Sequence, residues 1–452
     1  MGSSSNSSAL IVSSSCQGWS GTGLSGDENK SVVIPTGSTE NRTYTANWSI
    51  NSYRLDLIAG TGISKVTGAA VYQYGSNVSA SCTMQTGYQF DSWSGDLATD
   101  TFTMPAGNAT MTANAKPIDY VIEYDLAGGD LGTGQSNPVK YNVTSATITL
   151  INPTKEAPEN SIIKEYEFLG WTGSGIDEGT ASMTVTIPIG STGNKNYVAS
   201  WAVKVYCFNL SNTVTLEMRR CPPGTFMMGT PEGELGCLYN SGKPQHQVTL
   251  TKAFYIGKYE VTQDQFRAVD QSYPYSGNLP FSYTSYNELT NPNGGFISSI
   301  NSKLASQIPT GYIFDLPTEA QWEYACRAGT KTSLNSGKNI TATDSECLNL
   351  NDVGWYSFNS GDELHEVGLK TPNAWGLYDM HGNVFEICKD TSSQAYSSES
   401  VVDPLMEGSD GLTRGGAFNS IPAYCRSAAR NAYWPNSPQT NYGVRLVLVP
   451  IE

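Results

Sequence analysis

The residues best suited to chemistry lie near the C-terminus, and their chemistry is that of binding. Between Arg414 and Val449, two kinds of short segment alternate. Segments rich in Asn, Ser, Tyr and Trp are called insets here, and the motifs between them are called scaffold words: Arg414–Gly416, Cys425–Ala428, Arg430 and Gly443–Val447. Rigid amphipathic rings among small polar residues are typical of antibody paratopes. The composition therefore favours a ligand-binding segment over a merely polar surface loop, and it predicts that Tyr424, Tyr433 and Trp434 lie exposed on one face.

Thiols and imidazoles offer the alternative chemistry, that of metals or redox reactions. The nine cysteines include no CxxC pair, which excludes a zinc ribbon and a disulfide-dense framework, although one or two disulfides stay open. The three histidines, His246, His365 and His381, fall in separate words. We expect each of them to be a hydrogen-bonded scaffold residue rather than a metal ligand.

Length and composition set the class of protein. A chain of 452 residues is too long for one core and suggests roughly three domains. Charged residues make up only 15 %, a profile that suits extracellular β-rich modules. The net charge of −15 argues against a nucleic-acid partner, and no apolar run of about 18 residues predicts a membrane span.

Several elements must position the insets. Thr262 is expected to cap a helix over 263–269, and Thr318 a second helix that Gly329 closes. Both helices should pack on a twisted antiparallel sheet. The terminal strand, within Val444–Val449, is predicted to pair with Val248–Leu250 or with the strand preceding it.

The first half of the chain is repetitive. GWSGTG, VVIPTGST and YTANW between Gly18 and Trp48 return as GWTGSG, VTIPIGST and YVASW between Gly170 and Trp201, with a shorter copy from Trp93 to Ala115. These segments resemble Listeria–Bacteroides (internalin B-type) repeats, which are small β-grasp-like stalk modules. We expect the repeated Trp to be core, and the first copy, which lacks an opening strand, to be truncated in a chain that begins inside a longer protein.

From residue 205 onward the chain resembles the formylglycine-generating enzyme/sulfatase-modifying family. Five words in order carry the resemblance: Pro222–Thr230, Pro244–Leu250, Phe254–Thr262, Leu316–Gly329 and Pro372–Glu386. The resemblance implies an α+β, C-type-lectin-like fold. The implied domains are a truncated β-repeat at 1–49, β-repeats at 50–117 and 118–204, and the lectin-like domain at 205–452 with its variable segment at 414–449.

The resemblance also carries expectations about metals. Catalytic members hold copper on two cysteines, whereas here Ser420 stands at the first position and Cys425 is the only thiol in the segment. One thiolate cannot form a two-sulfur Cu(I) site, so we expect no catalysis and no required cofactor. In the family, one sequence motif binds Ca²⁺ through two side chains and two backbone carbonyls. The matching positions here are Asp379, Gly382, Val384 and Glu386. A turn braced by the same carboxylates without an ion is an equal alternative.

The terminal block further resembles the variable proteins of diversity-generating retroelements, of the Treponema type. In these proteins, Asn codons are randomised at their adenines while the scaffold stays constant. The positions reachable in this way are Asn419, Ser420, Ile421, Ala423, Tyr424, Asn431, Ala432, Tyr433, Asn436, Ser437, Thr440 and Asn441. Trp434 is not reachable, but we expect it to contact ligand together with these twelve.

The leading hypothesis is a non-enzymatic, ligand-binding protein of a bacterial surface. The expected partner is a protein or glycan on another cell or host surface, bound by a monomer whose leader or anchor lies outside this chain. A formylglycine-generating-type cysteine oxidase is the second hypothesis, and a purely structural surface protein is the third.

Overall fold

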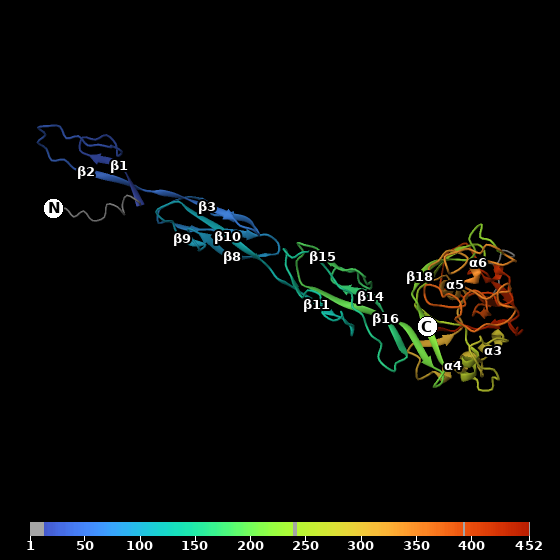
Figure 1. The fold of residues 1–452 in the computed structure, drawn as a ribbon. Coiled ribbons are helices and arrows are strands. Elements are labelled where there is room, and N and C mark those ends of the chain that lie inside the picture. Colours follow the sequence, from blue (N-terminus) through green and yellow to red (C-terminus); the bar gives the residue numbers. More distant parts are fainter. Residues whose placement is uncertain (1–12, 238–241, 392–393, 452) are drawn as a thin grey trace. The chain divides into compact units, whose positions relative to one another are not determined.

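The computed structural model describes residues 13–237, 242–391 and 394–451 and divides into two compact units (Figure 1). Unit 1 holds the described residues of Met1–Thr154 and Leu169–Ser200, and unit 2 those of Lys155–Phe168 and Trp201–Glu452. Within the described part, no helix has the length and apolar character needed to cross a membrane.

Unit 1 contains the repeats. Its strands are β1 (Ser14–Gly21), β2 (Tyr44–Ile50), β3 (Ser52–Ala59), β4 (Ile63–Thr67), β5 (Ala70–Gln73), β6 (Asn77–Ser79), β7 (Ser81–Met84), β8 (Tyr88–Gly95), β9 (Thr101–Thr103), β10 (Ala109–Pro117), β11 (Tyr120–Asp125), β12 (Lys140–Tyr141), β13 (Ile148–Thr149) and β15 (Thr186–Ile187). Two further strands are shared with unit 2: unit 1 holds the end of β14 (Ile163–Gly173) and the start of β16 (Lys195–Asn209).

The second and third repeats share one plan. In the second, β10 lies between β3, to which it is parallel, and β8, to which it is antiparallel (Figure 1). In the third, β16 is parallel to β11 and also pairs with β14. The repeated Trp is core in both, since Trp93 and Trp171 are 7 % and 0 % exposed. In the first repeat this expectation is wrong: Trp19 is 37 % exposed on the strand pair that β1 and β2 form within the described residues 13–50.

Unit 2 contains three sheets and short helices. Its remaining elements are β17 (Thr215–Cys221), β18 (Gly224–Met228), β19 (His246–Leu250), β20 (Phe254–Gly257), α2 (Gln263–Val269), α3 (Tyr286–Thr290), α4 (Phe296–Lys303), β21 (Tyr312–Asp315), α5 (Glu319–Arg327), α6 (Leu348–Asn351), β22 (Phe385–Ile387), β23 (Val401–Val402), β24 (Gly411–Arg414), the 3-10 turn η1 (Pro422–Cys425), β25 (Asn431–Tyr433), β26 (Tyr442–Gly443) and β27 (Val447–Pro450).

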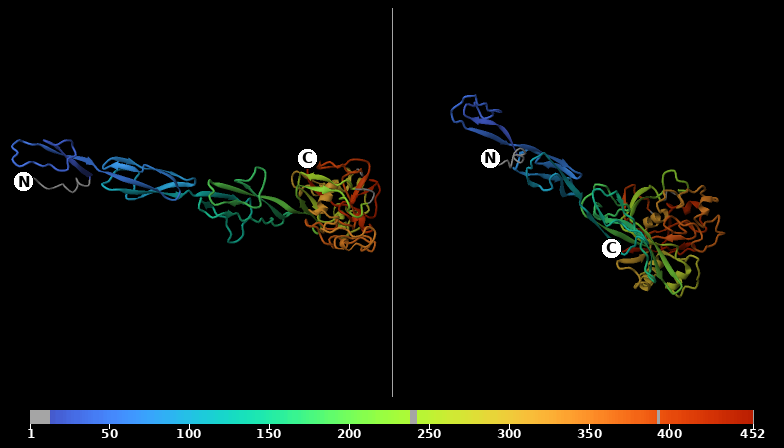
Figure 2. Two further views of the ribbon diagram at one scale, coloured as in Figure 1. Left: turned by 90° about the horizontal axis from the view of Figure 1, so that it is seen from above. Right: turned by 60° about the vertical axis from the view of Figure 1, so that its left-hand side comes forward.

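The terminal strand lies inside the main sheet, but its partners differ from those predicted. β27 pairs with β20 on one side and β21 on the other, whereas β19 belongs to a separate sheet with β18 and β23. The expected pairing of Val444–Val449 with Val248–Leu250 is therefore wrong. The buried strand β20 (Phe254, Tyr255, Ile256) offers β27 the more apolar neighbour. In both views of Figure 2 the C-terminal segment, drawn red, runs among the other elements of unit 2.

The two predicted helices form where expected. Thr262 and Thr318 each accept a hydrogen bond from the backbone three residues on, and Gln265 and Gln321 complete the capping boxes. α5 ends at Ala328, which adopts a left-handed conformation with φ of 43°, followed by Gly329 at φ 92°. Trp322 on α5 is fully buried, so this helix is a core element of the domain.

Candidate ligand-binding face

Four buried arginines fix the scaffold words of the terminal segment. The guanidinium of Arg430 donates to both carboxylate oxygens of Glu319, at 2.5 and 2.9 Å. Arg414 pairs with Glu323. Both acids lie on α5. The remaining two arginines pair with acids elsewhere in unit 2: Arg426 with Glu234 at 2.5 Å and Arg445 with Glu386 at 2.6 Å. Each scaffold word is thus tied to the domain at one buried charge.

Two arginines keep Glu323 ionised. Burial alone would raise the pKa of Glu323, but the guanidiniums of Arg327 and Arg414 outweigh burial and lower that pKa. Glu323 is therefore ionised and faces two cations. Removing one member of such a pair leaves a buried charge uncompensated, at a cost of about 3–5 kcal/mol. The scaffold words are consequently intolerant of change.

The insets between these words differ in exposure. Trp434 is 76 % exposed, and Asn419, Ala432, Asn436 and Thr440 are also exposed. A second group is half-buried at the rim: Ile421, Tyr424, Asn431, Ser437 and Asn441. The side-chain amide of Asn441 donates to Asn419 at 2.9 Å, so two insets meet. Ten of the thirteen predicted contact residues are therefore exposed or half-buried.

The prediction that three rings lie exposed holds for Trp434 alone, because Tyr424 is half-buried against the hydrophobic core and Tyr433 is buried. Tyr433 is 9 % exposed, its ring packs edge-on against Tyr442 at 4.9 Å, and a Cβ on Gly411 would lie 2.3 Å from the ring. The reason is strand geometry: in β25, successive side chains point to opposite faces. Tyr433 therefore turns into the core and Ala432 turns outward.

Ser420 and Ala423 are also buried, and their bonds are structural. The Ala417 N–H donates to Ser420 Oγ at 3.0 Å, and the Ser357 N–H donates to the Ser420 carbonyl at 3.0 Å. Arg426 Nε donates to the Ala423 carbonyl at 3.1 Å. These two predicted contact positions hold the inset in place and are closed to a ligand.

A neighbouring loop adds residues that sequence reasoning missed. The Asn287 N–H donates to the Pro435 carbonyl at 3.3 Å, and Thr284 forms a bridge with Gln439. Tyr283, beside this bridge, is exposed with φ of 65°, a strained conformation for a bulky residue. The sequence contained a signal for this loop, because the stretch from Tyr273 to Tyr286 is rich in Tyr and Ser and contains Asn, as the insets do.

The one thiol of the segment belongs to the core. Cys425 is buried, and burial raises the pKa of its thiol. Metals bind thiolates rather than thiols. A second thiol, Cys347, lies in the same apolar cluster and was missed. Burial would raise the pKa of Cys347, but hydrogen bonds from the Thr341 N–H and hydroxyl outweigh burial and lower it. Cys347 is thus the more readily ionised of the two.

The histidines do not gather at a metal site. His381 is fully buried, and burial lowers its pKa to about 4. Its Nδ1 donates to the Cys425 carbonyl at 2.7 Å, and its Nε2 accepts from the Asn335 N–H at 3.0 Å. His365 stacks on Trp355 at 3.7 Å. Over the described ranges, no three His, Cys, Asp or Glu side chains converge as metal ligands.

The two carboxylates of the motif predicted to bind calcium accept hydrogen bonds from protein groups. Glu386 accepts from Arg445 and, at 2.6 Å, from the Trp322 indole N–H. Asp379 accepts from the Gly368 N–H at 2.7 Å, and burial raises its pKa to about 6. A guanidinium already pairs with Glu386, whereas Asp379 Oδ1 is buried without a hydrogen-bond partner among the described residues. Calcium binding at Asp379, Gly382, Val384 and Glu386 stays a prediction, which calorimetric titration with Ca²⁺ tests.

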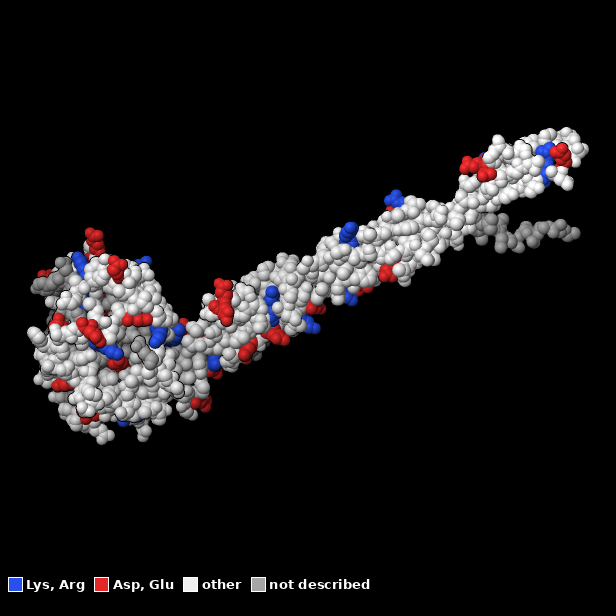
Figure 3. Space-filling model, turned by 180° about the vertical axis from the view of Figure 1, so that it is seen from behind, with Lys and Arg blue, Asp and Glu red and all other residues white. Residues whose placement is uncertain are grey.

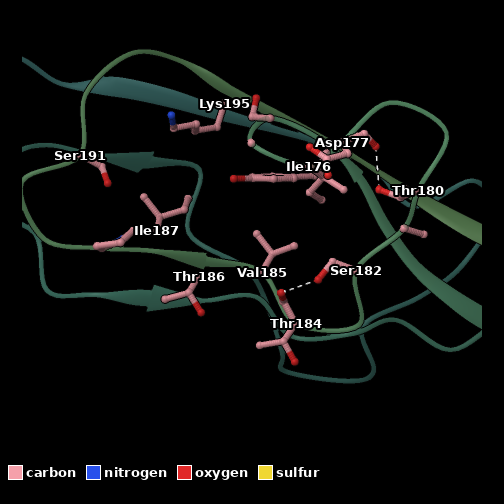
Figure 4. A pocket seen from close by; sticks show the side chains of 15 residues that line it. Ile176, Asp177, Thr180, Ser182, Thr184, Val185, Thr186, Ile187, Ser191 and Lys195 are labelled. Carbon is pink, nitrogen blue, oxygen red and sulfur yellow. Dashed lines mark hydrogen bonds between the residues drawn. The ribbon is translucent and has the colours of Figure 1, made fainter.

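Two other surface features bear on function. A hollow of about 470 Å³ lies in the third repeat, where the loop from Ser174 to Ser191 faces Lys195 (Figure 4). Several of its hydroxyls bond to neighbouring protein groups: Thr180 donates to the Asp177 carbonyl at 2.7 Å and Ser174 donates to Asn196 Oδ1 at 2.9 Å. On the face of unit 2 drawn in Figure 3, acidic and basic side chains are interspersed and form no basic patch. That face therefore lacks the footprint of a nucleic-acid site.

A mixed domain with a main sheet, three N-capped helices and buried arginine anchors is the C-type-lectin-like architecture that these motifs implied. The chain belongs to the formylglycine-generating enzyme/sulfatase-modifying family, since the sulfatase-modifying factor enzyme 1-like domain matches residues 209–294 and 297–449, more than half of the chain. Residues 55–119 match the divergent InlB B-repeat domain.

Known relatives share part of this chain. It is 31 % identical to the formylglycine-generating enzyme of Bos taurus over 140 residues, which is 29 % of this chain and 37 % of that protein. It is 35 % identical to the enzyme of Streptomyces coelicolor over 141 residues, 29 % of this chain and 45 % of that protein. The match therefore spans less than half the length of these relatives.

Two solved structures resemble about half of the chain. Treponema denticola variable protein 1 has a TM-score of 0.46 and 25 % identity, over 54 % of this chain and 99 % of that one. PvdO from Pseudomonas aeruginosa has a TM-score of 0.45 and 24 % identity, over 54 % of this chain and 97 % of that one.

Proposed function

We propose that the C-terminal domain is a non-enzymatic, ligand-binding domain displayed on a bacterial surface. Its contact face consists of the exposed insets of the segment 414–449 around Trp434, and its ligand is a protein or glycan of another cell or host surface. The observation that carries this proposal is the contrast between four buried arginine anchors and insets that expose a large ring and several amides.

Exposure of Trp434 supports a partner that covers it. Burial of a large apolar side chain is worth about 1.5–3 kcal/mol, and folding forgoes that gain here. Exposed aromatic anchors of this kind dominate the binding energy of many interfaces. The InlB-type repeats support surface display, because such modules occur in bacterial surface proteins.

Binding assays on the purified chain test the proposal directly. The labelled protein is applied to a glycan array and to panels of intact bacterial and host cells. We expect binding that the Trp434→Ala variant weakens at least tenfold. Val402→Ala is the matched control, because Val402 is an exposed apolar residue on a different sheet of the same unit. Equal loss in both variants would contradict a contact face at Trp434.

Diversification by a retroelement is the second part of the proposal. We expect a template repeat beside the gene, with a reverse transcriptase, and substitutions concentrated at the accessible positions. Ser420, Ala423 and Tyr433 should vary only among residues that fit a buried site, because their side chains are enclosed. Sequencing the locus from a growing population measures both. Free variation at these three positions would contradict a face made by the exposed insets.

The cysteine-oxidase alternative rests on one specific observation, the pair of thiols Cys347 and Cys425 in one apolar cluster. It is tested by copper stoichiometry and by oxidation of a sulfatase-type cysteine peptide. We expect neither stoichiometric Cu(I) nor turnover, because the Cys425 thiol is held protonated by burial. Stoichiometric Cu(I) that Cys347→Ser abolishes would establish the alternative.

A further inference from the structure

A small hollow in unit 2, called the α5 hollow here, is lined by residues of one sheet and one helix. The sheet is that of β18, β19 and β23, and the helix α5 contributes its first turn. The hollow has a volume of about 170 Å³. Most of its wall is apolar, formed by Met228, Ala320, Val401, Pro404 and Met406. Its described walls include no residue of the segment 414–449, so the α5 hollow is separate from the proposed contact face.

Two neighbouring polar groups in the α5 hollow lack a protein partner. Tyr396 is 7 % exposed, and its buried hydroxyl has no hydrogen-bond partner among the described residues. The centre of its ring lies 4.7 Å from that of the His246 ring. Nδ1 of His246 faces the Pro244 carbonyl at 3.3 Å and therefore carries a proton. In the neutral imidazole Nε2 is then an acceptor, and within residues 13–237, 242–391 and 394–451 nothing donates to it.

The acidic side chains in the wall already have partners. Both carboxylate oxygens of Glu319 accept from Arg430. The oxygens of Asp390 accept from the Glu319 N–H at 2.6 Å and from the Met406 N–H at 2.9 Å. Neither acid therefore calls for a cationic ligand, and both would repel an anion. Because a buried polar group without a partner costs free energy, the unpartnered hydroxyl and imidazole are the groups that a neutral ligand would satisfy.

We propose that the α5 hollow binds the neutral hydroxylated ring of a phenol. An apolar cavity of about 150 Å³ is large enough for benzene, so a hollow of about 170 Å³ accommodates one substituted ring. The phenol O–H donates to Nε2 of His246, and the phenol oxygen accepts from the Tyr396 hydroxyl. A ring without the hydroxyl would leave both protein groups unpaired, and sites built in this way reject such analogues. A free phenol and a tyrosine side chain of a peptide present the same group.

Calorimetric titration of the full chain with p-cresol tests this proposal, and toluene is the matched probe without the hydroxyl. We expect p-cresol to bind at a single site and toluene to bind at least tenfold more weakly. N-acetyltyrosine amide separates the two sources of the phenol. An affinity within about threefold of that of p-cresol would identify a tyrosine side chain as the occupant, and a weaker one would identify a free phenol.

The variant Tyr396→Phe removes the unpartnered hydroxyl and keeps the ring. We expect its affinity for p-cresol to fall at least tenfold, to the level of toluene. Its melting temperature without ligand should not fall, because no protein hydrogen bond is lost. The control is Tyr275→Phe, which alters an exposed tyrosine of the same unit and should bind p-cresol as the wild type does.

Three results would overturn the proposal. They are the absence of p-cresol binding, equal affinities of the wild type for p-cresol and toluene, and unchanged p-cresol binding by Tyr396→Phe. The comparison of p-cresol with toluene uses the wild type alone, so it decides the question even if the variant does not fold.

Discussion

Tyr433 and Trp434 are adjacent in sequence but belong to two regions of opposite physical character. Tyr433 lies with the anchored scaffold, packed on Tyr442, whereas Trp434 lies with the insets and is exposed. The scaffold is fixed by buried ion pairs that connect distant parts of unit 2, whereas the inset residues form no ion pair among the described residues. The comparison shows that one short segment combines buried, ion-paired residues with solvent-exposed ones.

The largest effect should come from breaking an anchor. Arg414→Met leaves Glu323 and Glu319 buried with one cation fewer, so we expect a loss of about 3–5 kcal/mol in the free energy of unfolding of unit 2. Urea denaturation followed by near-ultraviolet circular dichroism measures it. The control is Lys338→Met, which breaks an exposed pair with Asp352 and should cost less than about 1 kcal/mol. Equal effects would mean that the buried pair is no anchor.

The next effect separates the two neighbouring rings. Tyr433→Ala should destabilise unit 2 by about 3 kcal/mol, because it opens a cavity beside Tyr442. Trp434→Ala should change the free energy of unfolding by less than about 0.5 kcal/mol, as expected for an exposed site. Thermal unfolding of the two single variants tests this. If both behaved alike, the boundary between scaffold and inset would not fall between them.

A pH effect should sharpen the account of the Glu319 anchor. Asp390 accepts from the Glu319 N–H at 2.6 Å, and burial, together with the Glu319 charge, raises its pKa from 3.8 to about 6. Its folded pKa exceeds its unfolded value, so its contribution is fully present below pH 4 and is lost as pH rises through 6. The loss is about 2–3 kcal/mol at about 1.4 kcal/mol per pKa unit.

Urea denaturation at pH 4 and pH 7 checks this sign against the variant Asp390→Asn. The wild type should lose stability relative to the variant over that interval. A difference that stays constant between the two pH values would show that Asp390 does not titrate there.

The smallest effect concerns the exposed polar residues of the insets. Thr440→Ala and Asn436→Ala remove exposed polar groups, so each should leave stability within about 0.5 kcal/mol of wild type. Binding in the array assay should weaken two- to tenfold, less than for Trp434→Ala, because small polar contacts carry less energy than a large aromatic ring. A larger loss than that of Trp434→Ala would move the centre of the face.

Local features of the fold were predictable from the sequence, and distant ones were not. The caps at Thr262 and Thr318 depend on residues within one helical turn, and both were predicted correctly. The pairs Arg414–Glu323 and Arg426–Glu234 join residues 91 and 192 positions apart, and no local pattern selects such partners. The burial of Tyr433 followed from β25, a strand of three residues too short to produce a recognisable alternation.

The position of β27 has a consequence for how new versions of this protein would be screened. The strand comes after every inset, yet it lies between β20 and β21 in the main sheet. A frameshift or stop codon within the insets would therefore delete an interior strand of the sheet and leave its apolar neighbours uncovered. Products of that kind aggregate or are degraded. Folding itself would act as a reading-frame check, because only chains that contain β27 complete the main sheet.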